Sequence, residues 1–140
     1  MEEIEFAPIG FVISDFKEIQ DDPGIFQGTT AKIRVLDEYA GGLFRLENYQ
    51  RLYIIYFFDR AEGYRLVLHP RGDVSRPKRG VFATRAPYRP NPIGLAVVEL
   101  LSVDGNTITV RDLDAIDGTP VLDIKPWKDS YYDLGSDPLT

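Results

Sequence analysis

Arginine and proline residues alternate in one segment of the sequence, from Arg79 to Gly94 (RGVFATRAPYRPNPIG). Prolines restrict the backbone around Arg79, Arg85 and Arg89, so these side chains lose less conformational freedom when they pair with an anion. A guanidinium group can also donate two parallel hydrogen bonds to a phosphate or a carboxylate. The segment therefore predicts an anion-binding loop. The alternative is that its arginines donate to carbonyl groups of the loop itself and hold it in shape.

A second group of candidate residues lies between Arg111 and Pro126 (RDLDAIDGTPVLDIKP). Its four carboxylates are Asp112, Asp114, Asp117 and Asp123. Carboxylates near strand ends can bind ribose hydroxyls, a positively charged ligand or a hard metal ion. The spacing does not match an EF-hand loop, and we expect no metal site. Asp117 precedes Gly118, which favours a turn in which its side chain accepts from a backbone N–H two residues on. Asp114 is the stronger candidate for chemistry.

Composition excludes several kinds of catalysis. The sequence has no Cys and a single His, His69, which excludes thiolate zinc sites, iron–sulfur clusters, a cysteine nucleophile and poly-His metal sites. It also lacks the glycine-rich motifs of Rossmann domains and P-loop NTPases and the nucleophile elbow of α/β-hydrolases. His69 could act as a general base near neutral pH, although a single His in a loop more often has no chemical role.

Charge is distributed unevenly along the chain. The formal net charge is −6, yet the window from Gly63 to Val98 holds seven cations and one acid, a local charge of +6. The overall charge argues against non-specific coating of nucleic acid, because the whole molecule would repel phosphate. A polyanion docking on this window would instead be attracted. The alternative is a solvated basic loop that pairs with acids elsewhere in the fold.

The length of the chain and the placement of its Pro and Gly residues indicate the fold class. The chain has 140 residues, roughly one domain, and its ten Pro and twelve Gly separate short apolar runs, which is typical of a mainly β protein. No run approaches the roughly 18 apolar residues of a membrane helix. The acidic opening from Met1 to Glu5 is unlike the basic start of a signal peptide. We therefore expect a cytoplasmic protein with no membrane partner.

The apolar runs predict the individual elements. Leu52–Phe58 (LYIIYFF) is apolar on both faces and predicts a buried central strand. Asp104-Gly105 predicts a hairpin turn, and Asp37 is expected to cap a short helix that ends near Tyr49. Five prolines between Pro70 and Pro92 predict a long structured loop. The expected strands are Ile4–Ile13, Ala31–Leu36, Leu52–Phe58, Tyr64–Leu68, Gly94–Val103, Asn106–Leu113 and Val121–Ile124.

Three runs together resemble the tRNA methyltransferase O family, whose defining module is the TsaA-like domain. They are Pro8–Ile13 (PIGFVI), Gly80–Leu95 (GVFATRAPYRPNPIGL) and Asp117–Pro126 (DGTPVLDIKP). The resemblance extends from Pro8 to about Trp127. It implies a small, mostly antiparallel β-barrel as a single domain over residues 1–140, with a polar tail over 127–140. Larger members of the family carry a further C-terminal domain, and we expect this chain to consist of the barrel alone.

The resemblance also implies an activity. Members of the family use S-adenosylmethionine to methylate N6 of threonylcarbamoyladenosine next to the anticodon of tRNA. The implied cofactor-binding residues are Pro23, Gly24, Ile25, Asp59, Arg60, Arg85, Leu95, Arg111, Asp112, Leu113 and Asp114. Family members more often have His at the position of Asp59, and a backbone contact would survive this change of side chain.

Four residues are candidates for the transfer step. Arg85, Arg89 and Asn91 match the family's R-x-x-x-R-P-N-P run, which implies that they orient cofactor and substrate. We expect Arg85 or Arg89 to pair with the threonyl carboxylate of the substrate. Asp114, or water, is the candidate acceptor for the proton that N6 must lose.

Two other functions fit the residues. One is a non-catalytic RNA- or nucleotide-binding module in which the arginine loop neutralises a single strand and Tyr88 stacks on its bases. The other is a methyltransferase for a different small anionic substrate. In the tRNA methyltransferase interpretation we expect a homodimer, because a small barrel with so long a loop would gain from a partner that covers its site.

Overall fold

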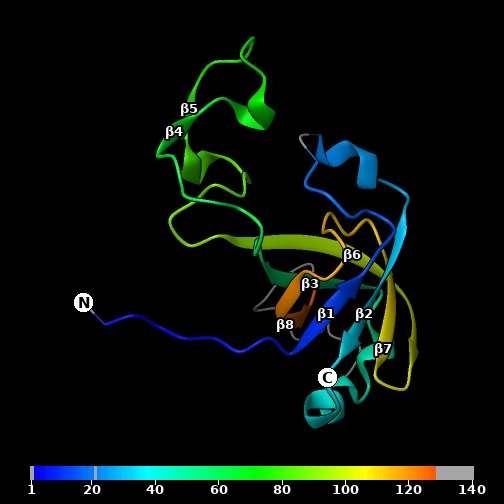
Figure 1. The fold of residues 1–140 in the computed structure, drawn as a ribbon. Coiled ribbons are helices and arrows are strands. Elements are labelled where there is room, and N and C mark those ends of the chain that lie inside the picture. The colour runs from blue at the N-terminus through cyan, green and yellow to red at the C-terminus, as the bar shows by residue number, and fades with distance from the viewer. Residues whose placement is uncertain (1, 21, 129–140) are drawn as a thin grey trace.

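The computed structural model describes residues 2–20 and 22–128. Six strands form a closed barrel in the order β1-β2-β7-β6-β3-β8, and every neighbouring pair is antiparallel (Figure 1). The strands are β1 (Gly10–Ile13), β2 (Thr30–Val35), β3 (Arg51–Phe57), β6 (Ile93–Asp104), β7 (Thr107–Arg111) and β8 (Pro120–Pro126). The predicted fold class is therefore confirmed.

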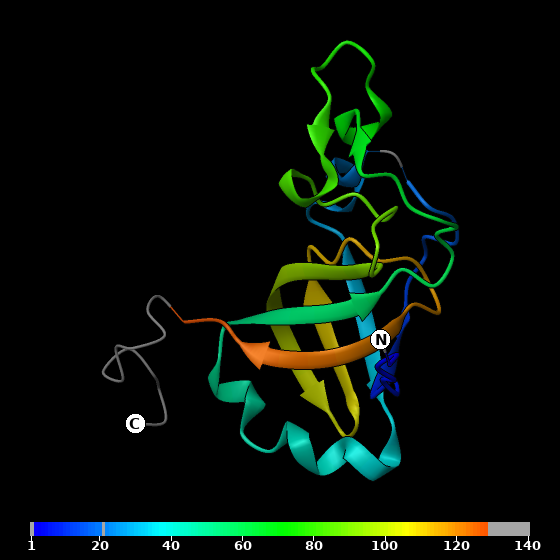
Figure 2. The same ribbon diagram turned by 90° about the vertical axis from the view of Figure 1, so that its left-hand side faces the viewer.

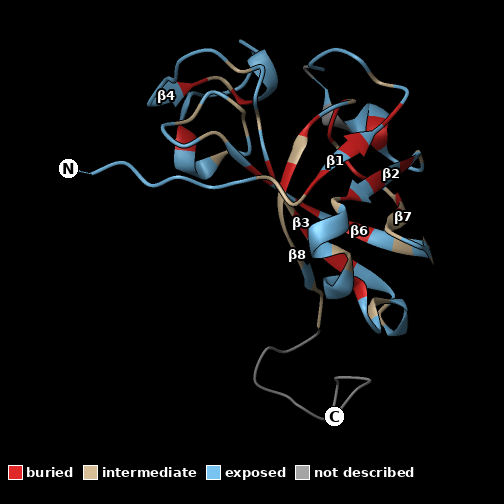
Figure 3. Ribbon diagram, turned by 60° about the horizontal axis from the view of Figure 1, so that its bottom comes forward, coloured by how far each residue is buried: buried red, intermediate tan, exposed pale blue. Residues whose placement is uncertain are grey.

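The barrel encloses an apolar core because side chains alternate between its inside and its outside. Leu52, Ile54 and Tyr56 of β3 point inward and are buried, while Phe57 faces outward and is exposed. Figure 3 shows buried residues concentrated on the barrel strands. The strand predicted over 52–58 is confirmed, and it is central because it pairs with both β6 and β8. The prediction that both of its faces are buried is wrong, since the outer face of a barrel has no second layer upon it.

The hairpin of β6 and β7 is confirmed. Asp104 pairs with Thr107, so that Gly105 and Asn106 form the turn, and Gly105 takes the positive φ of 59° that this turn requires. The amide of Asn106 Nδ2 donates to Asp37 Oδ1 at 2.7 Å. Asp37 therefore ties the hairpin to the segment that follows β2. The prediction that Asp37 caps a helix is wrong, because its side chain makes no capping hydrogen bond.

The predicted helix over 37–49 consists of two 3₁₀ segments, η2 (Asp37–Leu43) and η3 (Leu46–Asn48). Arg45 separates them with a left-handed φ of 66°. Gly41 and Gly42 explain the absence of a continuous α-helix, because glycine is a poor helix former. Figure 2 shows these segments across one end of the barrel, where Leu43 is buried in the core.

Two predicted strands are shorter in the structure. The strand expected over 4–13 begins only at Gly10, and Ile4 and Phe6 before it are exposed. The strand expected over 64–68 is limited to β4 (Val67–Leu68). Residues before Pro8 extend away from the barrel (Figure 1). Ile9 still contacts it, because its backbone N–H donates to the Val121 carbonyl of β8 at 2.8 Å.

The predicted Pro-rich loop is structured and forms most of what we call the basic lobe, residues 61–91. β4 pairs with β5 (Arg79–Gly80), and the lobe also holds the 3₁₀ turns η4 (Pro70–Gly72) and η5 (Val81–Ala83). Figure 2 shows the lobe projecting beyond the end of the barrel opposite η2. Opposite the lobe lies a further 3₁₀ turn, η1 (Pro23–Phe26) (Figure 1).

The end of the described chain continues from β8. The backbone N–H of Trp127 donates to the Arg51 carbonyl at 3.0 Å, and the Arg51 guanidinium lies 5.2 Å from the centre of the Trp127 ring. The rest of the tail predicted over 127–140 lies outside the described residues from position 129 onward. None of the helices among residues 2–20 and 22–128 is both long and apolar enough to cross a membrane.

Candidate functional site

A cleft of about 1360 Å³ separates the basic lobe from the end of the barrel. Its walls come from the lobe and from the segment around η1, which contributes Ile19, Gln20 and Phe26. Its floor includes Tyr56 and Phe58 at the end of β3, and residues 114–116 between β7 and β8. Segments far apart in the sequence therefore meet around one cleft.

Tyr56 and Asp114 form a hydrogen-bonded pair on the floor. Tyr56 is 2% exposed, and its hydroxyl donates to Asp114 Oδ1 at 2.8 Å. Burial, and then the neighbouring Asp114 carboxylate, raise the pKa of Tyr56 well above its usual value, while the charge of Arg85 opposes that shift. Tyr56 therefore remains a protonated donor across the physiological range.

The backbone after β7 brings Asp114 to this position. Asp112 adopts a left-handed φ of 72°, a conformation that Asp tolerates better than most residues. Its backbone N–H donates to the Thr29 carbonyl at 3.0 Å, and its side chain accepts from the Gly28 N–H at 2.6 Å. Leu113 is then buried in the core, and Asp114 faces the cleft. Asp112 and Leu113 thus fix the path of the chain.

The two candidate arginines differ in their surroundings. Arg85 lines the cleft and donates through Nη2 to the Leu95 carbonyl. Arg89 donates through Nη1 to the carbonyls of Thr84 at 2.9 Å and Ala86 at 3.2 Å. Arg89 therefore holds its own loop in shape, as the alternative interpretation predicts, whereas Arg85 ties the loop to β6. Of the two, only Arg85 is among the described residues that line the cleft. Asn91 lies outside that lining and accepts the Ile93 N–H through its carbonyl at 2.7 Å.

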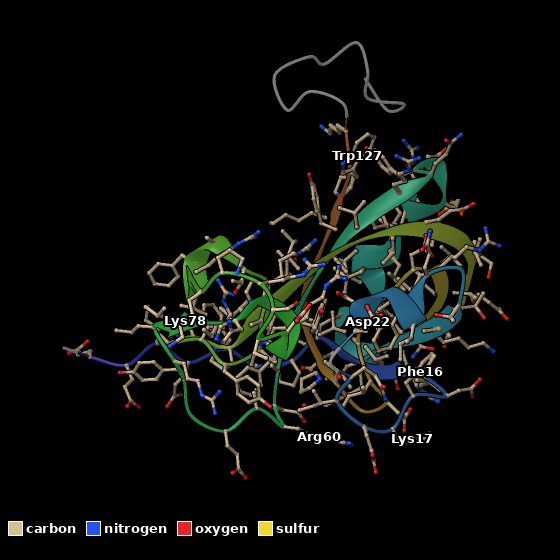
Figure 4. All side chains as sticks on the ribbon, turned by 90° about the horizontal axis from the view of Figure 1, so that it is seen from above. Phe16, Lys17, Asp22, Arg60, Lys78 and Trp127 are labelled. Carbon is tan, nitrogen blue, oxygen red and sulfur yellow. The ribbon has the colours of Figure 1, made fainter. Side chains whose placement is uncertain are left out.

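Asp59 and Arg60 follow β3 and both line the cleft. Asp59 is exposed, and its backbone N–H donates to the Phe57 carbonyl at 2.9 Å. Its carboxylate forms no hydrogen bond or ion pair with another described residue. Arg60 donates to the backbone carbonyls of Lys17 and of Asp117, the latter at 3.4 Å. Figure 4 shows Arg60 and Lys17 at the same edge of the molecule. Arg60 thus links segments at the margin of the cleft.

Asp117 has a structural role, but with a different partner from the one expected. Its Oδ1 accepts from the backbone N–H of Ser14 at 2.9 Å, and its Oδ2 forms an ion pair with Lys17 at 2.9 Å. These hydrogen bonds, that from Ser14 first, lower the pKa of Asp117. The predicted bond to an N–H two residues on is wrong, because the Thr119 N–H donates to the Ile116 carbonyl.

The remaining predicted cofactor residues lie around the cleft and not in its lining. Pro23, Gly24 and Ile25 precede Phe26, which does line it. The Leu95 side chain points outward from β6, and only its backbone carbonyl contacts Arg85, from which it accepts a hydrogen bond. Arg111 pairs with Glu99 at 2.8 Å on the outside of the hairpin. Of the eleven predicted cofactor residues, the cleft is lined by Asp59, Arg60, Arg85 and Asp114.

The cleft is predominantly positive. Its described lining holds seven cations, Arg60, Arg65, Arg71, Arg76, Lys78, Arg79 and Arg85, and three carboxylates, Asp59, Glu62 and Asp114. Figure 4 shows Lys78 on the lobe, across from Asp22 in the η1 region. Lys78 and Arg79 form no ion pair with another described residue, so their charge is available to a polyanion.

His69 also lines the cleft, within the lobe. Its Nδ1 lies 2.9 Å from the Arg76 carbonyl. Because a carbonyl oxygen can only accept, this hydrogen bond requires the hydrogen atom of the ring to be on Nδ1. This bond holds the start of the segment after β4 against the irregular segment that leads to β5. The contact favours the structural interpretation of His69 over a role as a general base.

Sequence reasoning missed Tyr56, Phe58 and Thr119, all of which line the cleft. Tyr56 was interpreted only as part of an apolar strand. The available signal was alternation: Leu52, Ile54 and Tyr56 share one face, so a hydroxyl enters the barrel at the end of that strand.

The family described as tRNA-methyltransferase O N-terminal domain matches residues 11–133 of this sequence. The chain belongs to the tRNA-methyltransferase O family. The predicted resemblance is thereby confirmed. The match includes all six barrel strands except the first residue of β1.

Individual members of the tRNA-methyltransferase O family and related proteins are similar over most of this chain. An "S-adenosyl-L-methionine-binding protein" of Archaeoglobus fulgidus is 48% identical over 122 residues, which are 86% of each chain. The "tRNA (adenine(37)-N6)-methyltransferase" of Escherichia coli is 34% identical over 91% of this chain and 59% of its own length. The crystal structure of TrmO from Pseudomonas aeruginosa has a TM-score of 0.72 at 29% identity, over 97% of this chain and 62% of that one. The chain thus spans about three fifths of the last two proteins.

Proposed function

We propose that the protein is an S-adenosylmethionine-dependent tRNA methyltransferase that acts on N6 of threonylcarbamoyladenosine next to the anticodon. The observation that carries this proposal is the Tyr56–Asp114 pair on the floor of a cleft whose opposite wall is basic. Family membership and the names of the relatives support it. The activity would be exerted in the cytoplasm, where tRNA is available.

The donor set of the cleft fits S-adenosylmethionine. Carboxylates suit its amino group and ribose hydroxyls, and Asp59, which lines the cleft, is the candidate for that contact. The rings of Phe26 and Phe58 offer apolar contacts to a planar base. Arg60 and Arg85 would line the same site, while Pro23 to Ile25, Leu95 and Arg111 to Leu113 would contribute backbone atoms or fix the segments that do. The bound cofactor supplies a methyl group on a positively charged sulfur, and no metal ion is needed.

Asp114 is the proposed proton acceptor. Methylation replaces the N6–H of the substrate by N6–CH₃, so one proton has to leave the nitrogen. The Asp114 carboxylate lies at the cleft surface and can take that proton. The cleft would also hold both reacting groups next to each other, so positioning would contribute a large part of the acceleration.

Arg85 is the better candidate to pair with the threonyl carboxylate of the substrate, since it lines the cleft while Arg89 and Asn91 support the loop behind it. We expect Arg85→Ala to raise KM for modified tRNA about ten-fold. Arg89→Ala should lower turnover by loosening the loop. Undiminished turnover in the Arg89→Ala variant would contradict the supporting role, and an unchanged KM in Arg85→Ala would contradict the pairing.

A second copy of the chain would cover the outer face of β3 and β6. Phe57, Ile93, Leu95 and Val97 form an apolar strip there, each 37–44% exposed. Such a continuous apolar surface is typical of interfaces. It adjoins the cleft through the Leu95 carbonyl, which binds Arg85. Light scattering should give the mass of a dimer, and Val97→Asp that of a monomer.

The decisive experiment supplies methyl-labelled S-adenosylmethionine together with either threonylcarbamoylated tRNA or the same tRNA as an unmodified transcript. Digestion to nucleosides then locates the label. Label on the modified adenosine alone supports the proposal. Cofactor binding without label on either RNA would favour a different anionic acceptor, and RNA binding without cofactor binding would favour a non-catalytic module.

A further inference from the structure

Tyr56 occupies an unusual position on β3. It is the last of three inward residues and the only one of them with a polar group, and its hydroxyl faces the cleft end of the barrel. That hydroxyl lies 2.8 Å from Asp114 Oδ1 and 3.4 Å from the Asp114 backbone carbonyl. Tyr56, a residue of the barrel core, is thus hydrogen-bonded to Asp114, the candidate proton acceptor.

The ring of Tyr56 has little freedom to move. A Cβ atom built on Gly94 would lie 2.5 Å from two atoms of the Tyr56 ring and 3.0 Å from Phe58. The Phe58 ring packs edge-on against Tyr56, with ring centres 5.2 Å apart. Only glycine at position 94 leaves room for both rings, because Gly94 pairs directly with Tyr56 across β3 and β6. The hydroxyl is therefore held at a fixed point.

The carboxylate of Asp114 depends on this one contact. No other described side chain or backbone N–H donates to it, and it forms no ion pair with a described residue. Arg85 from the lobe is the cation whose charge acts on the Tyr56–Asp114 pair. Other charged or titratable groups of the cleft lining include Asp59, Arg60 and His69. With Oδ1 engaged by Tyr56, Oδ2 is free for a substrate.

We infer that Tyr56 is a positioning residue that holds the Asp114 carboxylate so that Oδ2 faces the substrate nitrogen. This inference rests on the proposed function. In the transfer step the N6–H bond breaks, and its proton forms an O–H bond with Oδ2. The electron pair left on N6 bonds the methyl carbon as the methyl–sulfur bond of the donor breaks, and the electron pair of that bond stays on sulfur and neutralises its positive charge. Tyr56 keeps its own proton throughout. A neutral donor to Oδ1 also stabilises the charged form of the carboxylate before the proton arrives.

The test compares Tyr56→Phe, which keeps the ring, with Tyr39→Phe in η2 at the far end of the barrel as the matched control. We expect Tyr56→Phe to lower kcat about ten-fold with saturating substrates. The Kd for S-adenosylmethionine, measured by calorimetry, should change less than two-fold. In an Asp114→Asn background the same substitution should have almost no effect on kcat, because the two residues act as a unit.

A readout without substrate tests the contact itself. Absorbance titration should superimpose for wild type and Tyr56→Phe through the range around pH 10 in which exposed tyrosines ionise, because Tyr56 stays protonated there. Ionisation of one additional tyrosine in the wild type would overturn the inference. Unchanged kcat in Tyr56→Phe, or an equal loss in both backgrounds, would also overturn it while wild-type activity upholds the proposed function. A wild type that methylates no RNA refutes the proposed function itself.

Discussion

The floor of the cleft and the basic lobe are built by opposite means. The floor belongs to a closed barrel, in which every strand has two neighbours and the inward side chains are buried. The lobe holds only a two-residue pairing of β4 with β5, and most of its residues are exposed (Figure 3). Its shape depends on prolines, on Arg89, which donates to loop carbonyls, and on Arg85, which donates to a carbonyl of β6. The difference separates a rigid site for chemistry from a charged surface for a polyanion.

The largest effect on the rate of methyl transfer is expected from a change to the carboxylate on the floor of the cleft. Asp114→Asn removes the proposed proton acceptor while leaving a group that can still accept from Tyr56. We expect methyl transfer to fall about 100-fold, as is typical for the loss of a general base. Asp123→Asn on β8, where the side chain pairs with Lys125, is the matched control. Single-turnover kinetics would measure both, and equal rates in the two variants would contradict the assignment.

The next effect tests the rigidity of the floor. Gly94→Ala introduces a Cβ against the Tyr56 ring and should lower the free energy of unfolding by about 1–3 kcal/mol, the cost of overpacking a core. Gly41→Ala is the matched control, because a Cβ there meets open space. Urea denaturation compares the two. If Gly94→Ala were as stable as Gly41→Ala, the floor would be more compliant than the structure indicates.

A smaller effect is expected from the lobe. Replacing Lys78 and Arg79 by Ala should weaken tRNA binding about ten-fold at moderate salt and lower the slope of log affinity against log salt by about one for each lost phosphate contact. The rate with saturating tRNA should not change. Lys32 and Arg34, on the outside of β2, provide a control pair of equal charge. An equal loss in the control pair would show that net charge alone governs binding.

The smallest effect concerns the link between the barrel and the margin of the cleft. Hydrogen bonds from Ser14 and Lys17 lower the pKa of Asp117. A lowered pKa contributes stability above the unfolded value of about 3.9, and this stability is lost as the pH falls through the folded value. Asp117→Asn should therefore melt below wild type at pH 7 and approach it at pH 3. Asp15→Asn, at an exposed position, should follow wild type at both.

Local sequence signals predicted most of the barrel. Alternation in β2, the apolar run of β3 and the Asp104-Gly105 turn each act over a few residues, so they can be interpreted without knowledge of the fold. The helix over 37–49 was predicted with the wrong cap because Asp37 bonds to Asn106, 69 positions away. The extended strand over 4–13 was overpredicted because its first half finds no neighbouring strand.

The sequence by itself determined the mainly β class, the hairpin, the Pro-rich loop, the positive window and the family resemblance, since all of these depend on residue type and short spacing. Only the tertiary structure decided which side chains meet. Tyr56 and Asp114 are 58 positions apart, and Asp117 and Ser14 are 103 apart. Barrel closure joins such pairs, because it fixes the register of six strands at once, whereas local pattern constrains each strand alone.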